Sequence, residues 1–132
     1  MLYIQGFVEY LQLNEWNAVI DVGALLVPNR RLSSLIFGAG EVGAAVRSPL
    51  AARGVPPDAS VGFRLCHDPH VDDIHSQSFA SLEELQSFVD SERETEVGVL
   101  VAETNFDVLL RLMDVLGDRF GRANIRMVVF FD

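Results

Sequence analysis

The residues best suited to chemistry gather in one stretch of ten, C-H-D-P-H-V-D-D-I-H at positions 66–75. This stretch holds the only cysteine of the chain, Cys66, and its three histidines, His67, His70 and His75. Zinc is held by three or four Cys, His or carboxylate ligands, so these four side chains are candidate metal ligands. A cysteine beside a histidine also suits nucleophilic catalysis. The third interpretation is a polar, acidic loop whose histidines are exposed to solvent.

We favour the polar loop over the metal site and the catalytic pair. No second ligand group such as C-x-x-C lies elsewhere in the chain, so one short loop would have to supply the whole metal site. Pro69 also places a turn between the first two histidines. Cys66 ends an apolar segment, which predicts a buried and unreactive thiol. The metal site remains the second interpretation, with Cys66, His67, His70 and His75 as its ligands.

A second group of candidate residues begins at His75, which is followed by Ser76 and Ser78. In an enzyme, His75 would act as the general base, and one of the two serines as the nucleophile or as an orienting group. No third residue that would orient the histidine stands at a recognisable spacing. A histidine at this position also suits hydrogen bonding to the turn at residues 53–58 or contact with a partner. A small hydrolase-like or transferase-like enzyme is therefore the alternative to a binding protein.

Residues 38–43, G-A-G-E-V-G, match the G-x-G-x-x-G pattern of dinucleotide-binding loops. In such folds the glycines permit a tight turn and the close approach of a pyrophosphate to a helix N-terminus. Two neighbouring residues argue against this role. Pro49 falls within the helix that should follow the loop, and Glu41 adds negative charge where the phosphates would lie. Nucleotide binding stays an alternative, and the chain predicts no cofactor.

The composition is acidic, with 19 Asp and Glu against 10 Arg and no Lys, which gives a formal net charge of −9. Such a surface repels phosphate backbones, which argues against general nucleic-acid binding, and it attracts a basic protein partner. No apolar run approaches the roughly 20 residues of a membrane span, and the first residues lack the pattern of a signal peptide. A single cysteine agrees with a reducing compartment. We therefore expect a cytoplasmic protein that binds another protein and no membrane.

The second half of the chain carries the clearest secondary-structure signals. Residues 81–84, S-L-E-E, form a capping box, which predicts the start of a helix. Residues 97–102 are a nearly continuous apolar run, typical of a strand buried on both faces. The apolar residues of 106–120 follow one helical stripe, and residues 125–131 are apolar on both alternating faces. Strand, helix and strand in this order predict a parallel, right-handed pair with 125–131 in the centre of the sheet.

The first half is less regular. Residues 3–11 are rich in aromatic and β-branched side chains and predict a strand, and residues 16–26 suit either a strand or a helix. A short helix is expected from Pro28 to Gly38. Residues 49–60 contain three prolines and a glycine and predict turns, followed by a short strand over 61–65.

These elements predict one α/β domain over residues 1–132, with α+β as the alternative class. We expect a mixed sheet of four or five strands with two or three helices. The strand at 3–11 is expected to be an exposed edge, which is compatible with a monomer or with a homodimer that pairs along this edge.

Four segments of the chain, taken in order, resemble a family of small proteins encoded by phages and by bacteria that carry prophages. The segments are F-G at 37–38, P-L-A-A-R-G-V-P-P-D-A-S at 49–60, H-S-Q-S-F-A-S-L-E-E-L at 75–85 and I-R-M-V-V-F-F-D at 125–132. That family shows an R-G-[LV]-P-x-D-x-S turn, an H-S-x-S-aromatic segment before a helix, and a hydrophobic last strand that ends in Asp. The resemblance covers most of the chain and implies a placement more than a mechanism.

The resemblance marks five candidate partner-binding residues, which are Arg53, Asp58, His75, Ser76 and Ser78. It leaves out the other members of the 66–75 cluster, which weakens the metal site. These five residues form either an interface or the support beneath it, and an ion pair between Arg53 and Asp58 is the structural alternative. The acidic charge, the small size and the few catalytic signals predict a protein that occludes a protein partner, as phage-encoded inhibitors and immunity proteins do.

Overall fold

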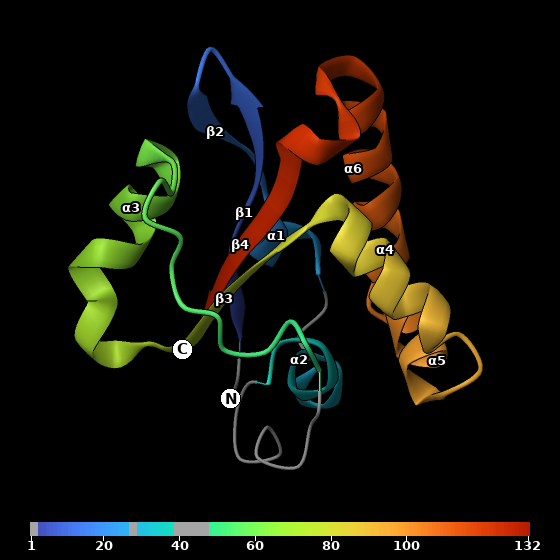
Figure 1. The fold of residues 1–132 in the computed structure, drawn as a ribbon. Coiled ribbons are helices and arrows are strands. Elements are labelled where there is room, and N and C mark those ends of the chain that lie inside the picture. The colour runs from blue at the N-terminus through green and yellow to red at the C-terminus, as the bar shows by residue number, and fades with distance from the viewer. Residues whose placement is uncertain (1–2, 27–28, 39–47) are drawn as a thin grey trace.

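The computed structural model describes residues 3–26, 29–38 and 48–132 of the chain (Figure 1). Its centre is a four-stranded sheet in the order β2-β1-β4-β3, in which all neighbouring pairs are antiparallel. The mixed α/β class and the four-stranded sheet agree with the prediction. The strands are β1 (Ile4–Gln12), β2 (Glu15–Asp21), β3 (His75–Ser81) and β4 (Ile125–Phe131).

Helices cover both faces of this sheet (Figure 1). One face carries α1 (Val22–Leu25), α2 (Arg30–Phe37), α4 (Leu82–Ser91), α5 (Glu96–Glu103) and α6 (Phe106–Phe120). The other carries α3 (Val61–His67), which continues into the 3₁₀ helix η2 (Asp68–Asp73), and a second 3₁₀ turn, η3 (Arg122–Asn124), precedes β4. The described ranges thus hold more helices than the two or three expected. None of the helices in these ranges is long and apolar enough to cross a membrane.

Strand β4 lies between β1 and β3, as its two apolar faces predict. All of its residues are buried. The side chains at odd positions from 125 to 131 join the large core beneath α2, α4, α5 and α6. Val128 and Phe130 point to the opposite face and pack with Phe63 of α3 in a smaller cluster. The two-residue period of a strand therefore divides β4 between two cores.

The apolar run at 97–102 lies in the helix α5, so the predicted strand and the predicted parallel pair are wrong. Thr95 caps this helix by accepting a hydrogen bond from the N–H of Val97, and Glu96 places an acid in its first turn. Val97 and Val101, four residues apart, are buried, whereas Val99 is exposed. A short apolar run fits a buried helix as well as a buried strand, and here the cap decides between them.

The predicted strand at 61–65 is also wrong, because these residues lie in α3. Ser60 caps this helix by accepting a hydrogen bond from the N–H of Phe63. Phe63 and His67 are buried four residues apart, while Val61 and Leu65 are exposed. Burial at a four-residue spacing belongs to a helix that packs one face on the sheet.

The edges of the sheet differ from the prediction. Strand β1 is paired with β2 on one side and with β4 on the other, so residues 3–11 offer no exposed edge. The two edges are β2 and β3. The sequence does not predict β3, because its first half is polar and the register with β4 shifts between His75 and Ser78.

Three predicted features at element boundaries are confirmed. Helix α2 ends at Gly38, whose φ of 70° is the left-handed conformation that favours glycine. Ser81 and Glu84 form the reciprocal hydrogen bonds of a capping box at the start of α4. The apolar stripe of residues 106–120 forms α6, which begins after Asn105 and ends at Gly121.

Candidate functional site

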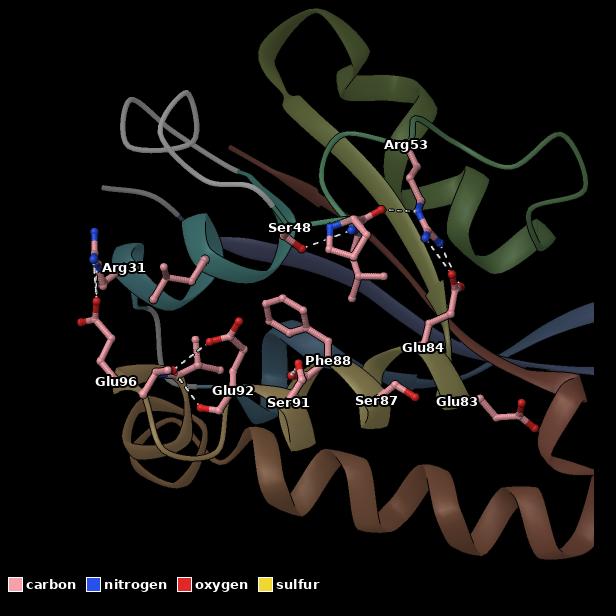
Figure 2. Close-up of a pocket in the computed structure, with 15 residues that line it drawn as sticks. Arg31, Ser48, Arg53, Glu83, Glu84, Ser87, Phe88, Ser91, Glu92 and Glu96 are labelled. Atoms are coloured by element: carbon pink, nitrogen blue, oxygen red, sulfur yellow. Dashed lines mark hydrogen bonds and ion pairs between the residues drawn. The ribbon is translucent and has the colours of Figure 1, made fainter.

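A cleft of about 960 Å³ opens on the side of the sheet that carries most of the helices (Figure 2). It lies between α2, α4, the start of α5 and the loop at residues 48–53. Four of its apolar lining residues come from these four segments, namely Leu35, Leu50, Phe88 and Val97. Leu50 and Val97 are buried, whereas Leu35 and Phe88 keep part of their surface open to the cleft.

Charged side chains surround this apolar floor, and among the described residues acids outnumber bases. The described lining contains four glutamates, Glu83, Glu84, Glu92 and Glu96, and two arginines, Arg31 and Arg53. Both arginines already bind a glutamate within the protein. The remaining negative charge makes the cleft a place that attracts cations.

One end of the cleft is bounded by an ion pair between α2 and α5 (Figure 2). Arg31 donates to Oε1 of Glu96 from Nε at 2.8 Å and from Nη2 at 2.5 Å. The guanidinium lowers the pKa of the Glu96 carboxyl. Both side chains are about half exposed, so water screens this pair and leaves it easy to separate.

The other end is bounded by Arg53 and Glu84 (Figure 2). The guanidinium donates to both carboxylate oxygens, at 2.9 and 2.6 Å, and also to the carbonyl oxygens of Pro49 and Phe79. Glu84 accepts a further hydrogen bond from the N–H of Ser81 as part of the capping box. The hydrogen bonds from Arg53 are the main reason that the pKa of Glu84 falls to about 2. Arg53 thereby joins the loop, β3 and α4.

Glu83 and Glu92 are the two glutamates of the cleft without a cation. Within the described chain, no basic side chain forms an ion pair with either of them. Glu83 is exposed in the first turn of α4, and Glu92 follows the last turn, where it accepts a hydrogen bond from the hydroxyl of Thr95. The two carboxylates therefore stand at opposite ends of α4 (Figure 2) and are free to bind a cation from outside.

The predicted ion pair between Arg53 and Asp58 is wrong. Asp58 accepts hydrogen bonds from Nη1 of Arg126 at 3.0 Å and from the indole of Trp16 at 3.1 Å. Arg126 lowers the pKa of Asp58 and also donates to Glu9, which is fully buried, at 2.7 Å. Asp58 therefore fixes the turn at 49–60 to the sheet and lies outside the cleft lining.

The predicted serines and histidine have different environments. Ser78 is fully buried, where its hydroxyl donates to the carbonyl of Leu50 at 2.5 Å and accepts from the N–H of Arg53 at 3.2 Å. It supports the cleft loop from beneath. His75 is exposed, and its Nδ1 lies 2.9 Å from the hydroxyl of Ser76. In the part of the chain that the structure describes, no third residue hydrogen-bonds to the His75 ring and orients it.

The four candidate metal ligands of the 66–75 cluster are not brought together. Cys66 is exposed, contrary to the expectation of a buried thiol, and His67 is buried. His70 and His75 are exposed. Among the residues placed by the structure, no group of three or more His, Cys, Asp or Glu is arranged to hold a metal ion.

His67 has a structural environment. Its ring stacks on Phe63 with centroids 5.1 Å apart and meets Phe130 edge-on at 5.5 Å. Nδ1 lies 2.8 Å from a carboxylate oxygen of Asp68, and the buried Nε2 has no hydrogen-bond partner within the described residues. His67 thus belongs to the small core that joins α3 to the sheet.

The glycine pattern at 38–43 lies almost wholly outside the described residues. Gly38 is its one described member, and it serves as the C-cap of α2. The predicted nucleotide loop therefore has no structural account.

The cleft itself was not found from the sequence. A signal was present, because Glu84, Phe88 and Glu92 recur every four residues and so share one side of α4. The two arginines that bound the cleft come from distant segments, at Arg31 and Arg53, and no local pattern connects them to α4. The sequence identified Arg53 as a candidate but assigned it the wrong ionic partner.

No family model, curated protein or solved structure matches this chain. The resemblance to phage-encoded proteins stays a prediction from the four quoted segments. The site is therefore defined by geometry alone, as an apolar cleft in whose described lining carboxylates outnumber guanidinium groups.

Proposed function

We propose that this protein is a small acidic protein-binding domain that inhibits or neutralises a basic partner by occluding part of its surface. The observation that carries the proposal is the cleft, in which an apolar floor lies between two glutamates that no cation of the described chain neutralises. A site of this kind suits lysine and arginine, because each has an apolar stem and a charged head. The stem would lie on Phe88 and Leu35, and the head would reach Glu83 or Glu92.

The charge of the whole molecule supports the same partner. With a net charge of −9, the protein attracts a basic surface over a distance of about 10 Å at ordinary salt and accelerates the encounter. A domain of this size that binds without chemistry acts by covering a surface. Inhibitors and immunity-type proteins act in this way.

The enzyme alternative has one observation in its favour, the contact between His75 and Ser76 at 2.9 Å. A serine needs a base that is itself oriented by a third group before it becomes a good nucleophile. The described residues supply no such group to His75, so binding accounts for more of the molecule than catalysis does.

The test uses the purified protein and the purified products of the genes that flank its own. Complex formation is followed by size-exclusion chromatography and calorimetry at low and high salt. We expect one basic partner, with an affinity that falls at least tenfold in the double variant Glu83→Gln, Glu92→Gln. This variant removes both free charges of the cleft and keeps side-chain size and hydrogen bonding.

The matched control is the double variant Asp72→Asn, Asp73→Asn. It removes the same charge from exposed residues of η2, outside the cleft lining. A partner whose affinity drops only in the cleft variant supports the proposal. Equal affinities for the two variants would show that net charge acts without the cleft, and the absence of any complex would contradict the function itself.

A further inference from the structure

The walls of the cleft determine which kind of segment can enter it, provided that the proposed protein-binding function holds. In the described ranges the cleft is lined by α2, α4, the turn between α4 and α5, the start of α5 and the loop at 48–53, and no strand borders it. Helices use their backbone groups internally, so they offer no row of free N–H and C=O groups. A partner strand would find no edge to extend here.

Three backbone carbonyls of the loop at 48–53 already accept hydrogen bonds within the protein. The carbonyl of Ser48 accepts from the N–H of Ala51, that of Pro49 from Nε of Arg53, and that of Leu50 from the hydroxyl of Ser78. We therefore expect a partner in the cleft to be bound mainly through contacts with side chains. An incoming segment would have to satisfy its own backbone, and an α-helix does so.

The free carboxylates of Glu83 and Glu92 indicate the charge and the length of the site. Glu83 in the first turn of α4 and Glu92 just after its last turn are nine positions apart, which corresponds to about 13.5 Å along the helix axis and to about half a turn around it. Phe88 lies between them in Figure 2, and the two ion pairs Arg31–Glu96 and Arg53–Glu84 lie at the two ends. The apolar lining of the cleft therefore has a free negative charge near each end, one on either side of α4.

We propose that the cleft is a groove for one amphipathic α-helix of the partner, with an apolar stripe on the floor and two basic residues about two helical turns apart. Two turns of a helix span about 11 Å, and the long side chains of arginine or lysine cover the remaining distance to Glu83 and Glu92. The apolar residues of the partner contact Phe88, Leu35 and Leu50. In helix-in-groove binding of this kind, the groove contacts residues at positions i, i+3, i+4 and i+7 of the bound helix.

The experiment uses a labelled synthetic peptide of about 15 residues, a length at which an isolated helix begins to form. It is composed of alanine, leucine and two arginines placed eight positions apart beside a leucine stripe. A second peptide has the same sequence with two central residues in the D configuration, which breaks the helix without changing composition or charge. Fluorescence anisotropy measures binding to the wild-type protein and to the cleft and η2 double variants.

We expect the helical peptide to bind wild type and the η2 variant alike, and to bind the cleft variant at least tenfold more weakly. The D-containing peptide should bind wild type at least tenfold more weakly than the helical one. The variant Phe88→Ala, shown to be folded by its thermal unfolding, should also weaken the helical peptide.

Equal binding of the two peptides would overturn the helix inference and leave a basic protein partner in place. If the affinity of the helical peptide is the same for wild type, the cleft variant and Phe88→Ala, the groove is not the binding site. Failure of both peptides to bind would also overturn the inference. The partner experiment with flanking gene products decides the proposed function separately.

Discussion

Arginine–carboxylate pairs lie on both sides of the sheet, and they differ in how completely their charges are matched. Arg126 on β4 donates to Glu9 and to Asp58, and its guanidinium lies 3.8 Å from the ring centre of Trp16. Glu9 has no exposed surface, and its second oxygen accepts from the N–H of Ser60. We call this network closed, because both carboxylates share the guanidinium of Arg126 and so have a cationic partner inside the protein.

In the cleft on the other side of the sheet, not every carboxylate has a cationic partner within the described chain. Arg53 and Arg31 each neutralise one glutamate, while Glu83 and Glu92 have no cation in the described chain. Closed networks hold a fold together, since removing one member leaves a buried charge alone. Unmatched charges at a cleft contribute little to stability and remain available to a partner. The comparison separates residues that maintain the structure from the residues that we propose bind a partner.

The largest effect on stability is expected at Arg126. Arg126→Ala leaves Glu9 buried without a cation and should lower the free energy of unfolding by about 3–5 kcal/mol, measured by urea denaturation. The matched control is Arg93→Ala, whose side chain is 70% exposed and paired only with Asp90 on the surface. It should cost about 0.5 kcal/mol or less.

Replacing both partners sharpens this prediction. The double variant Glu9→Leu, Arg126→Met removes the buried pair of charges together and should recover a large part of the loss, because Asp58, which also loses Arg126, is exposed to water. If Arg126→Ala alone lowers the free energy of unfolding by as little as Arg93→Ala does, the view that the network is structural is contradicted.

The next effect is expected at Glu84 and depends on pH. The folded-state pKa is lowered to about 2 from 4.5, so the stabilisation is present above pH 4.5 and is lost as the pH falls towards 2. The side chain is 41% exposed, and screening reduces the contribution to about 1–2 kcal/mol. Glu84→Gln keeps the capping box and lacks the charge. The difference in unfolding free energy between wild type and this variant should shrink by about 1–2 kcal/mol from pH 6 to pH 2.5. A difference that stays constant with pH would contradict the lowered pKa of Glu84.

A smaller effect is expected at His75, which is exposed and contacts Ser76 and the ring of Phe131. His75→Ala should cost about 1 kcal/mol or less in urea denaturation and leave partner affinity unchanged. Occlusion also predicts that the biological effect persists in this variant, whereas the enzyme alternative predicts that it is lost. Loss of the biological effect with stability and partner affinity intact would favour catalysis over occlusion.

The smallest change in stability is expected for the cleft double variant Glu83→Gln, Glu92→Gln. Its unfolding free energy should stay within about 0.5 kcal/mol of wild type, since the only expected loss is the interaction of Glu83 with the dipole of α4. The same variant should lose partner affinity at least tenfold. A large stability loss would place these carboxylates with the closed network and remove the contrast between the two regions.

Local signals determined the helix boundaries and the centre of the sheet. The Ser81–Glu84 capping box, the stop at Gly38, and the two apolar faces of β4 each depend on neighbouring residues, so the sequence by itself was sufficient. The same kind of information failed at 61–65 and 97–102. A short apolar run suits two buried elements, and the choice between them depends on the packing partner across the core.

Tertiary structure alone decided which charges meet. Arg53 is 31 positions from Glu84, and Arg126 is 117 positions from Glu9. Composition predicted an acidic protein with an affinity for basic partners, because net charge is a sum over residues and needs no coordinates. Which carboxylates are neutralised inside and which remain free at α4 is a property of distances between remote segments, and only folding sets those distances.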